Sequence, residues 1–308
     1  MRKPLVLLFS AFLALCLLNA CAKDLYQRVE SRKSFFETDV DHRAYVKKAF
    51  VVLNHGAATP FGSAIDTLFL QSLVETIDDE VDHFVAVSPY SSGSADALKS
   101  QDLFSTPAQI FDMAKAARMQ GYHYLMDAGV WQIEPTLKKT GTWIFRKERG
   151  YLHLVTALDV YDVFTAAKLL SLVEESTVKI SLNAYESLVA GLQDGLEIVE
   201  EELVEHAVRL GEQAAEAINR APWMAVVSAV ESEQVTLAAD GASGLKVGHR
   251  LTVYEGRRFV TGPDGARFIA PGYQLGRIRI TGIESDQIRA TMETPADIKP
   301  GDIATAAE

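Results

Sequence analysis

YLHLVTALDVYDV, residues Tyr151–Val163, is the stretch that decides the fold. Its apolar side chains alternate with polar ones, which is the pattern of a β-strand with one buried face. A second strand is predicted at Tyr122–Ile133 (YHYLMDAGVWQI), and the alternation continues over Lys168–Ile180. Three consecutive strands of this kind predict a meander at the centre of a sheet.

Shorter elements precede these strands. The apolar runs Ala49–Leu53 and His83–Val87 have the composition of buried strands. Apolar residues at helical spacing between Ser63 and Ile77 predict a helix that connects them. Thr106, which stands before a proline, predicts the N-cap of a further helix that ends at Gly121. The order strand, helix, strand, helix, strand and meander predicts an α/β (α+β) domain.

The segment Asn183–Asn219 is predicted to be helical, with a break near Gly191 and Gly195 and a long helix from about Asp194. Its apolar residues recur at spacings of three and four, so we expect them to pack on the sheet; a homotypic coiled coil is the alternative. The opposite face carries a run of acidic residues, which we interpret as a solvated face: Glu200, Glu201, Glu202 and Glu205.

Pro222 marks a change to short strands and frequent turns. The predicted strands are 225–230, 234–238, 250–254, 267–269, 274–283 and 287–292. Thr261–Gly265 (TGPDG) has the composition of a hairpin turn. Two copies of one pattern, LKVGH at Leu245 and IKPGD at Ile298, each lead into a strand. Six short strands with glycine corners predict a small all-β barrel, SH3-like or related.

Composition excludes some classes of function. The chain has 308 residues, 48% of them hydrophobic and 23% charged, which is typical of a globular protein with two domains. The formal net charge of −11 makes nucleic acid an unsuitable partner. The sequence contains no P-loop, no Gly-x-Ser-x-Gly elbow and no His-Glu-x-x-His motif. We therefore predict no enzyme activity, no cofactor and no metal.

Isolated residues with chemical potential have structural explanations. His123 and His153 lie on predicted strands where they could face each other, but no third ligand has metal spacing. Asp159 and Asp162 are predicted on opposite faces of one strand, which rules out a paired acid and base. The loop Tyr90–Gly93 (YSSG) could hold a ligand, and a cryptic hydrolase that uses Ser91 or Ser92 is a minor hypothesis.

The three tryptophans are candidate anchors for a partner. We interpret Trp131 as a core residue and expect Trp143, beside Lys138 and Lys139, to be exposed. The remaining one, Trp223, stands at the start of the predicted barrel.

The N-terminus carries an export signal. Arg2 and Lys3 precede a run of 14 residues, Leu5–Leu18, which is apolar except for Ser10 and too short to span a bilayer. The end of this run, Leu18-Asn-Ala-Cys21, resembles the lipobox of bacterial lipoproteins, in which the cysteine is acylated after cleavage. An ordinary signal peptide with a chance cysteine is the alternative.

Cleavage before Cys21 would leave 308 − 20 = 288 residues, with 28 basic and 41 acidic side chains. Cys16 would be lost with the signal, so no disulfide could form within the chain. In bacterial lipoproteins an aspartate directly after the acylated cysteine is a signal for retention at the inner membrane. Ala22 stands at that position here, so the resemblance to lipoproteins implies the periplasmic face of the outer membrane. The predicted organisation is a signal peptide at 1–20, a lipidated tether at 21–48, the α/β domain at 49–221 and the barrel at 222–308.

The segment Ala49–Ala221 resembles the N-terminal domain of the Tol-Pal translocation protein B, a fold shared with the curli secretion lipoprotein G and with periplasmic activators of penicillin-binding proteins. The similarity rests on the opening strand AFVVLNHG, the helix end ARMQG before Tyr122, and the strand YHYLMDAGV. Thr156–Ala167 matches a strand and turn of that family, in which Ala166 replaces the usual glycine.

The segment Trp223–Thr305 is similar to the C-terminal domain of flagellar assembly protein T. The similarity rests on Gly244–Gly248, Leu251–Tyr254, Gly262–Gly265, Leu275–Ile278 and Ile298–Asp302, with His249 in place of the usual acidic residue. Together the two resemblances imply a non-enzymatic lipoprotein that acts as a structural or assembly factor, in a flagellar basal-body ring or as a homo-oligomeric ring. The alternative is an accessory lipoprotein of another envelope machine, for secretion or peptidoglycan synthesis.

Overall fold

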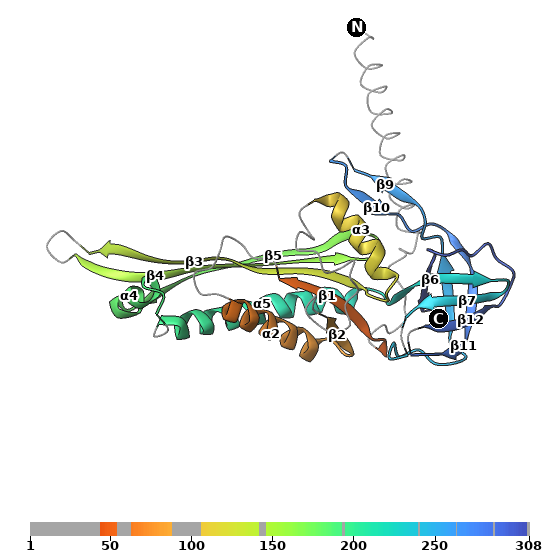
Figure 1. The fold of residues 1–308 in the computed structure, drawn as a ribbon, viewed down its shortest axis with the longest axis horizontal. Helices are drawn as coiled ribbons and strands as arrows, with labels where there is room; N and C mark the ends of the chain where they lie inside the picture. Colours follow the sequence, from red (N-terminus) through yellow and green to blue (C-terminus); the bar gives the residue numbers. More distant parts are fainter. Residues whose placement is uncertain are drawn as a thin grey trace, which may run out of the picture. The chain divides into compact units, whose positions relative to one another are not determined.

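A computed structural model of the chain combines a mixed α/β sheet with a small antiparallel barrel (Figure 1), which confirms the predicted fold class. The structure describes residues 44–53, 63–87, 106–141, 146–192, 195–239, 241–262, 264–285 and 287–306. No described helix has the length and apolar character needed to cross a membrane.

The first sheet has five strands in the order β2-β1-β3-β4-β5. Strand β1 (Lys47–Leu53) lies parallel to β2 (Phe84–Val87) and to β3 (Tyr124–Thr140). The predicted meander follows, with β4 (Lys147–Asp162) antiparallel to both β3 and β5 (Ala167–Ile180). The three long strands are thus consecutive in sequence and adjacent in the sheet.

Helices cover the two faces of this sheet unequally (Figure 1). One face packs against α2 (Ser63–Glu80), α4 (Leu182–Val189) and α5 (Leu196–Arg220). Among the described helices, α3 (Pro107–Arg118) alone lies on the opposite side, which we call the outer face. Most side chains of β4 that point toward α5, such as Leu152, Leu154 and Leu158, are fully buried, because the alternation predicted from sequence places them in the core.

Local signals explain where the helices begin and end. The Thr106 hydroxyl accepts a hydrogen bond from the Gln109 amide at 3.3 Å, which confirms the predicted N-cap of α3. The predicted break lies between α4 and α5, where Gly191 has a φ of 68°. The apolar stripe of α5 packs on the sheet as expected, and a Cβ at Gly211 would come within 2.8 Å of Thr76 on α2.

The second sheet is a closed barrel in the order β11-β12-β7-β6-β13-β8. Its strands are β6 (Met224–Glu231), β7 (Gln234–Ala238), β8 (Arg250–Tyr254), β11 (Gln274–Ile283), β12 (Ile288–Met292) and β13 (Ile303–Ala306). The prediction that Arg267–Ile269 belongs to the barrel is wrong. That segment, β10, pairs with β9 (Phe259–Thr261) in a separate hairpin, and β13 closes the barrel instead.

The two copies of the repeated pattern form the same turn. Gly248 and Gly301 have φ values of 93° and 95°, a region that favours glycine. In one copy the His249 ring accepts a hydrogen bond from the Lys246 amide at 3.3 Å; in the other the Asp302 carboxylate accepts one from the Lys299 amide at 2.7 Å. A histidine nitrogen therefore replaces the carboxylate oxygen, and each turn leads into a barrel strand.

The predicted tether at 21–48 is wrong for its last residues, whereas residues 21–43 lie outside the described part of the chain. Lys47 and Lys48 belong to β1, which begins two residues before the predicted start at Ala49. The Val46 amide donates to the Ser243 carbonyl of the barrel at 3.1 Å. This segment therefore joins the two sheets and does not hang free of them.

Candidate functional site

A buried lysine fixes the end of α5 against the first strand. Lys47 is 1% exposed, and its ammonium donates to the carbonyls of Ile218 at 2.5 Å and Ala221 at 2.8 Å. The last carbonyls of a helix lack partners within the helix, and the helix dipole places partial negative charge there. The Lys47 ammonium donates hydrogen bonds to these carbonyls and places a positive charge beside the negative end of the helix dipole. It does so at the point where the chain passes from α5 into the barrel.

His123 lies beside this contact, between the sheet and the barrel. Its Nδ1 accepts a hydrogen bond from the Lys48 amide at 3.1 Å, and its ring lies 5.8 Å from Phe164 and 5.9 Å from Trp223. Burial, and then the Lys47 cation, lower the pKa of His123 to about 3. The ring is therefore neutral and carries its proton on Nε2, which lies near the Met224 backbone without reaching hydrogen-bond geometry.

Further contacts hold the barrel against the α/β domain. The rings of Tyr45 and Trp223 are 5.5 Å apart, and a Cβ at Gly121 would meet the Ala238 carbonyl at 3.2 Å. The β9–β10 hairpin reaches α3, where the Arg267 guanidinium lies 4.2 Å from the centre of the Phe111 ring. These contacts lie within residues Val40–Glu308, which form one compact unit.

The turn between β4 and β5 holds a non-glycine residue at a positive φ. The Asp162 carboxylate accepts hydrogen bonds from the amides of Phe164 and Thr165, at 3.1 and 3.2 Å, and from the Thr165 hydroxyl. Ala166 has a φ of 57°, in the left-handed region that a glycine adopts at lower cost. The Thr165 carbonyl in turn accepts a hydrogen bond from the Ile269 amide of β10 at 2.8 Å.

The residues with catalytic potential are not brought together. His153 on β4 lies opposite Glu134 and bonds Thr177, whereas His123 lies near the other end of β3. Asp159 pairs with Lys168 on β5 at 2.5 Å, separately from the Asp162 turn. Among the described residues no group of three or more histidine, cysteine or acidic side chains is placed to hold a metal.

Other predicted sites lie beyond the described residues, namely Cys21, Trp143 and the loop Tyr90–Gly93 with Ser91 and Ser92. One further buried histidine, His206 on α5, shares a 3.0 Å hydrogen bond with the Thr156 hydroxyl of β4, and burial lowers its pKa.

The prediction that Trp131 is a core residue is wrong. Its side chain is 54% exposed, because Trp131 is the extra, unpaired residue of a bulge in β3: Val130 pairs with Thr156, and Gln132 with the next residue, Val155. Thr156 points toward α5, so its neighbours Val155 and Ala157 belong to the outer face, and Trp131 projects there too.

Two more exposed apolar side chains lie on the outer face, both from β5. Val173 pairs with Ala157 and is 60% exposed, and Leu169, the extra residue of a second bulge, is 40% exposed. Trp131, Val173 and Leu169 form the set that we call the apolar row. Aromatic and branched residues in such a position are typical of contact surfaces.

Strand β5 is also an edge strand with an open side. Thirteen of its fourteen residues pair with β4, and no other strand of the described part pairs with it. Helix α5 supports it from the opposite face through a 3.2 Å ion pair between Arg209 and Glu174 and a 3.1 Å hydrogen bond between Ser176 and Glu202. A long supported edge of this kind can accept a strand from another protein.

Sequence reasoning missed the two features that matter most here. The predicted tether includes Lys47. The only local sign of its structural role is a pair of lysines directly before an apolar strand. The exposure of Trp131 depends on a bulge, which the alternation of β3 does not reveal.

Comparisons with solved structures find distant similarity to several bacterial proteins, some of them described as lipoproteins. No family model matches the chain, and no curated protein matches it. The PelC dodecamer from Paraburkholderia phytofirmans is similar with a TM-score of 0.31 at 16% identity, over 55% of this chain and 87% of that chain. Lipoprotein GNA1162 from Neisseria meningitidis has a TM-score of 0.27 at 10% identity, over 49% and 99% of the two chains. A minor lipoprotein from Acinetobacter baumannii has a TM-score of 0.25 at 13% identity, over 56% and 95%.

Proposed function

We propose that this chain is a non-enzymatic envelope lipoprotein that holds other proteins in position. The observation that carries the proposal is the junction formed by Lys47, His123 and Trp223. The centre of the Trp223 ring, at the start of the barrel, lies 5.9 Å from that of His123 and 5.5 Å from that of Tyr45, and the Val46 amide donates to the Ser243 carbonyl, so the barrel contacts the sheet there as a scaffold requires. The lipobox at Cys21 would anchor this unit to the periplasmic face of the outer membrane, since acyl chains bind a bilayer by burying methylene groups.

The apolar row and the edge of β5 are the surfaces that we assign to a protein partner. A photo-crosslinking residue at Val173, on the exposed side of β5, is expected to form adducts with that partner in cells. The matched control is Glu200, which is exposed on α5, away from the edge. Equal adducts at both positions, or none at Val173, would refute the assignment.

Anchoring is tested separately. A Cys21→Ser form is expected to leave the outer-membrane fraction, because it can no longer be acylated; a variant that still fractionates with outer-membrane vesicles would contradict the lipoprotein assignment. An intact Cys21 form with the same signal peptide is the control.

The partner that we favour is a ring of the flagellar basal body, on the resemblance of Trp223–Thr305 to flagellar assembly protein T. Deletion of the chain is expected to reduce motility and to remove or weaken a basal-body ring. Unchanged motility and unchanged rings would exclude this role. They would favour the second candidate, an accessory lipoprotein of secretion or peptidoglycan synthesis, which predicts co-purification with subunits of those machines.

A further inference from the structure

The distal end of the β3–β4–β5 meander carries four cations on the outer face. Lys138 lies directly opposite Arg149, and Lys147 lies two residues before Arg149 on the same strand. On β5, Lys179 lies opposite Tyr151, whose ring is 5.4 Å from the Lys138 ammonium. Opposite residues in an antiparallel pair, and residues two apart in a strand, point to the same side. We call Lys138, Lys147, Arg149 and Lys179 the cationic face.

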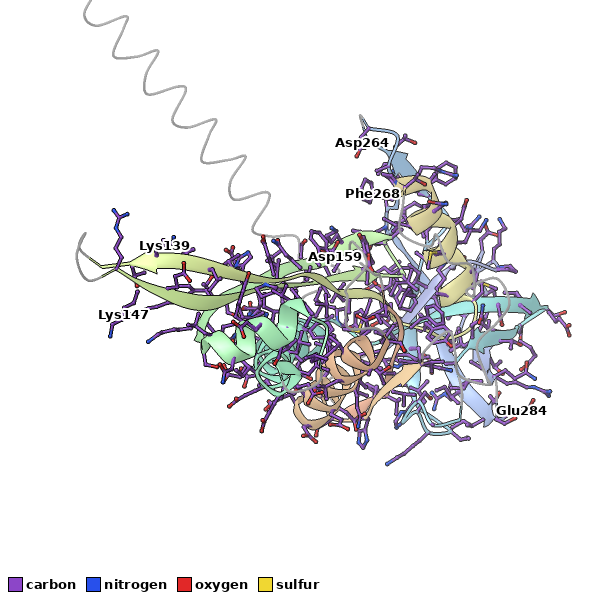
Figure 2. All side chains as sticks on the ribbon, turned by 60° about the vertical axis from the view of Figure 1, so that its left-hand side comes forward. Lys139, Lys147, Asp159, Asp264, Phe268 and Glu284 are labelled. Carbon is purple, nitrogen blue, oxygen red and sulfur yellow. The ribbon has the colours of Figure 1, made fainter. Side chains whose placement is uncertain are left out.

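The cationic face has no counter-charge of its own. All four side chains are exposed, and none of them makes an ion pair within the described ranges. On the opposite side of the same hairpin, by contrast, Lys139 pairs with Glu148 at 3.4 Å. Figure 2 shows Lys139 and Lys147 at the end of this hairpin. The direct opposition of Lys138 and Arg149 destabilises the sheet in isolation, so an external anion would relieve it.

The cationic face is distinct from the apolar row. Eight residues of β4 separate Arg149 from Ala157, a distance of about 26 Å at about 3.3 Å per residue. Charges are screened over about 8–10 Å at physiological salt, so the cationic face acts on a partner independently of the rest of the chain. The remainder of the chain is strongly acidic. The whole chain has 41 acidic and 30 basic residues, and four of the basic residues belong to the cationic face.

We propose that the cationic face docks on the surface of a bilayer that contains anionic phospholipids. Lipid phosphates match a flat array of three lysines and one arginine, and an aromatic side chain such as Tyr151 is suited to the headgroup region. The inference rests on the proposed function, which keeps the chain near a membrane. The net negative charge of the chain as a whole disfavours contact with an anionic leaflet, whereas the cationic face favours it. Contact through the cationic face therefore sets the orientation of the anchored protein and leaves the edge of β5 free for its partner.

The test uses residues Val40–Glu308, which form one compact unit with both hydrophobic cores and lack Cys21. Binding to vesicles of phosphatidylcholine, alone or mixed with phosphatidylglycerol, is measured by co-sedimentation at low and physiological salt. Binding is expected only with phosphatidylglycerol and is expected to weaken with salt. Replacing Lys138→Gln together with Arg149→Gln is expected to lower the affinity about 30-fold, at about fivefold for each cation.

The matched control is Lys115→Gln with Lys246→Gln, which removes the same charge from exposed positions on α3 and in the turn before β8, far from the cationic face. It is expected to bind within about twofold of the unmodified chain, because each charge acts only within its screening length. Circular dichroism and urea unfolding verify that both variants fold.

Three results would overturn the proposal: equal binding to both kinds of vesicle, equal losses in the test and control variants, or no binding to either kind of vesicle. In the last case, self-association that the Lys138 and Arg149 substitutions abolish would assign the face to an acidic protein surface. Since this unit lacks the acylation site, the outcome is independent of the Cys21→Ser fractionation.

Discussion

Acidification from pH 7 to pH 5 is expected to destabilise this chain through His123. The folded state holds this ring neutral, with a pKa of about 3, whereas the unfolded chain has the ordinary value of about 6.5. The unfolded state therefore binds more protons between these values. The stabilisation is fully present above pH 6.5 and is lost progressively as the pH falls toward 3.

The expected magnitude follows from the two pKa values. At pH 5 the unfolded histidine is almost fully protonated and the folded one is not, so the free energy of unfolding falls by about 2 kcal/mol relative to pH 7. His206 contributes in the same direction, because burial lowers its pKa as well. Asp162 acts in the opposite direction, because burial raises the pKa of its carboxyl, so the contribution of His123 is read from the difference between the unmodified chain and a His123 variant.

The assay is urea unfolding at pH 7 and pH 5, followed by tryptophan fluorescence, to which Trp223 contributes as a residue buried against His123. In His123→Asn the amide oxygen can still accept from the Lys48 amide, but the side chain no longer titrates. This variant is less stable at pH 7, since it loses ring contacts, and its drop to pH 5 is smaller by about 2 kcal/mol. His153→Asn, on the outer face, should retain the full drop.

Equal pH dependence in the unmodified chain and in His123→Asn would refute the reasoning. It would mean that the junction admits water or opens at pH 5, so that the ring titrates alike in both states. The proposed close contact between the two domains at this junction would then be refuted as well.

Three further expectations concern stability, measured by urea unfolding at pH 7. Lys47→Met removes both hydrogen bonds to the end of α5 and should cost about 2–4 kcal/mol, whereas Lys48→Met should cost less than about 1 kcal/mol; similar losses would contradict the capping role. Ser232→Gly should stabilise by about 0.5–1 kcal/mol, because Ser232 has a φ of 57° in an exposed turn, and Ser232→Ala, which keeps the Cβ, should not. Thr156→Val should lower the free energy of unfolding by about 1–3 kcal/mol, because it leaves the buried ring of His206 without its hydrogen-bond partner. The same substitution in a His206→Leu background should cost less. Additive losses would exclude an energetic coupling between the two side chains.

Much of the fold follows from local pattern. Alternation over Tyr151–Val163 predicts β4, and the spacing of apolar residues predicts α5 and its buried stripe. The cap at Thr106 and the paired turns at Leu245 and Ile298 also follow from nearby residues alone. The residues that signal each of these features lie close together in the sequence. The pattern therefore predicts them without knowledge of distant contacts.

Tertiary structure alone decided the rest. Whether Arg267–Ile269 or Ile303–Ala306 closes the barrel depends on which distant strands pair, and both segments are suitable strands. The bulge at Trp131 and the opposition of Lys138 to Arg149 depend on the register of β3 against β4, which moves a side chain to the other face with each single-residue shift. The cap that Lys47 provides joins residues more than 170 positions apart, and only the folded chain brings that ammonium to the end of α5.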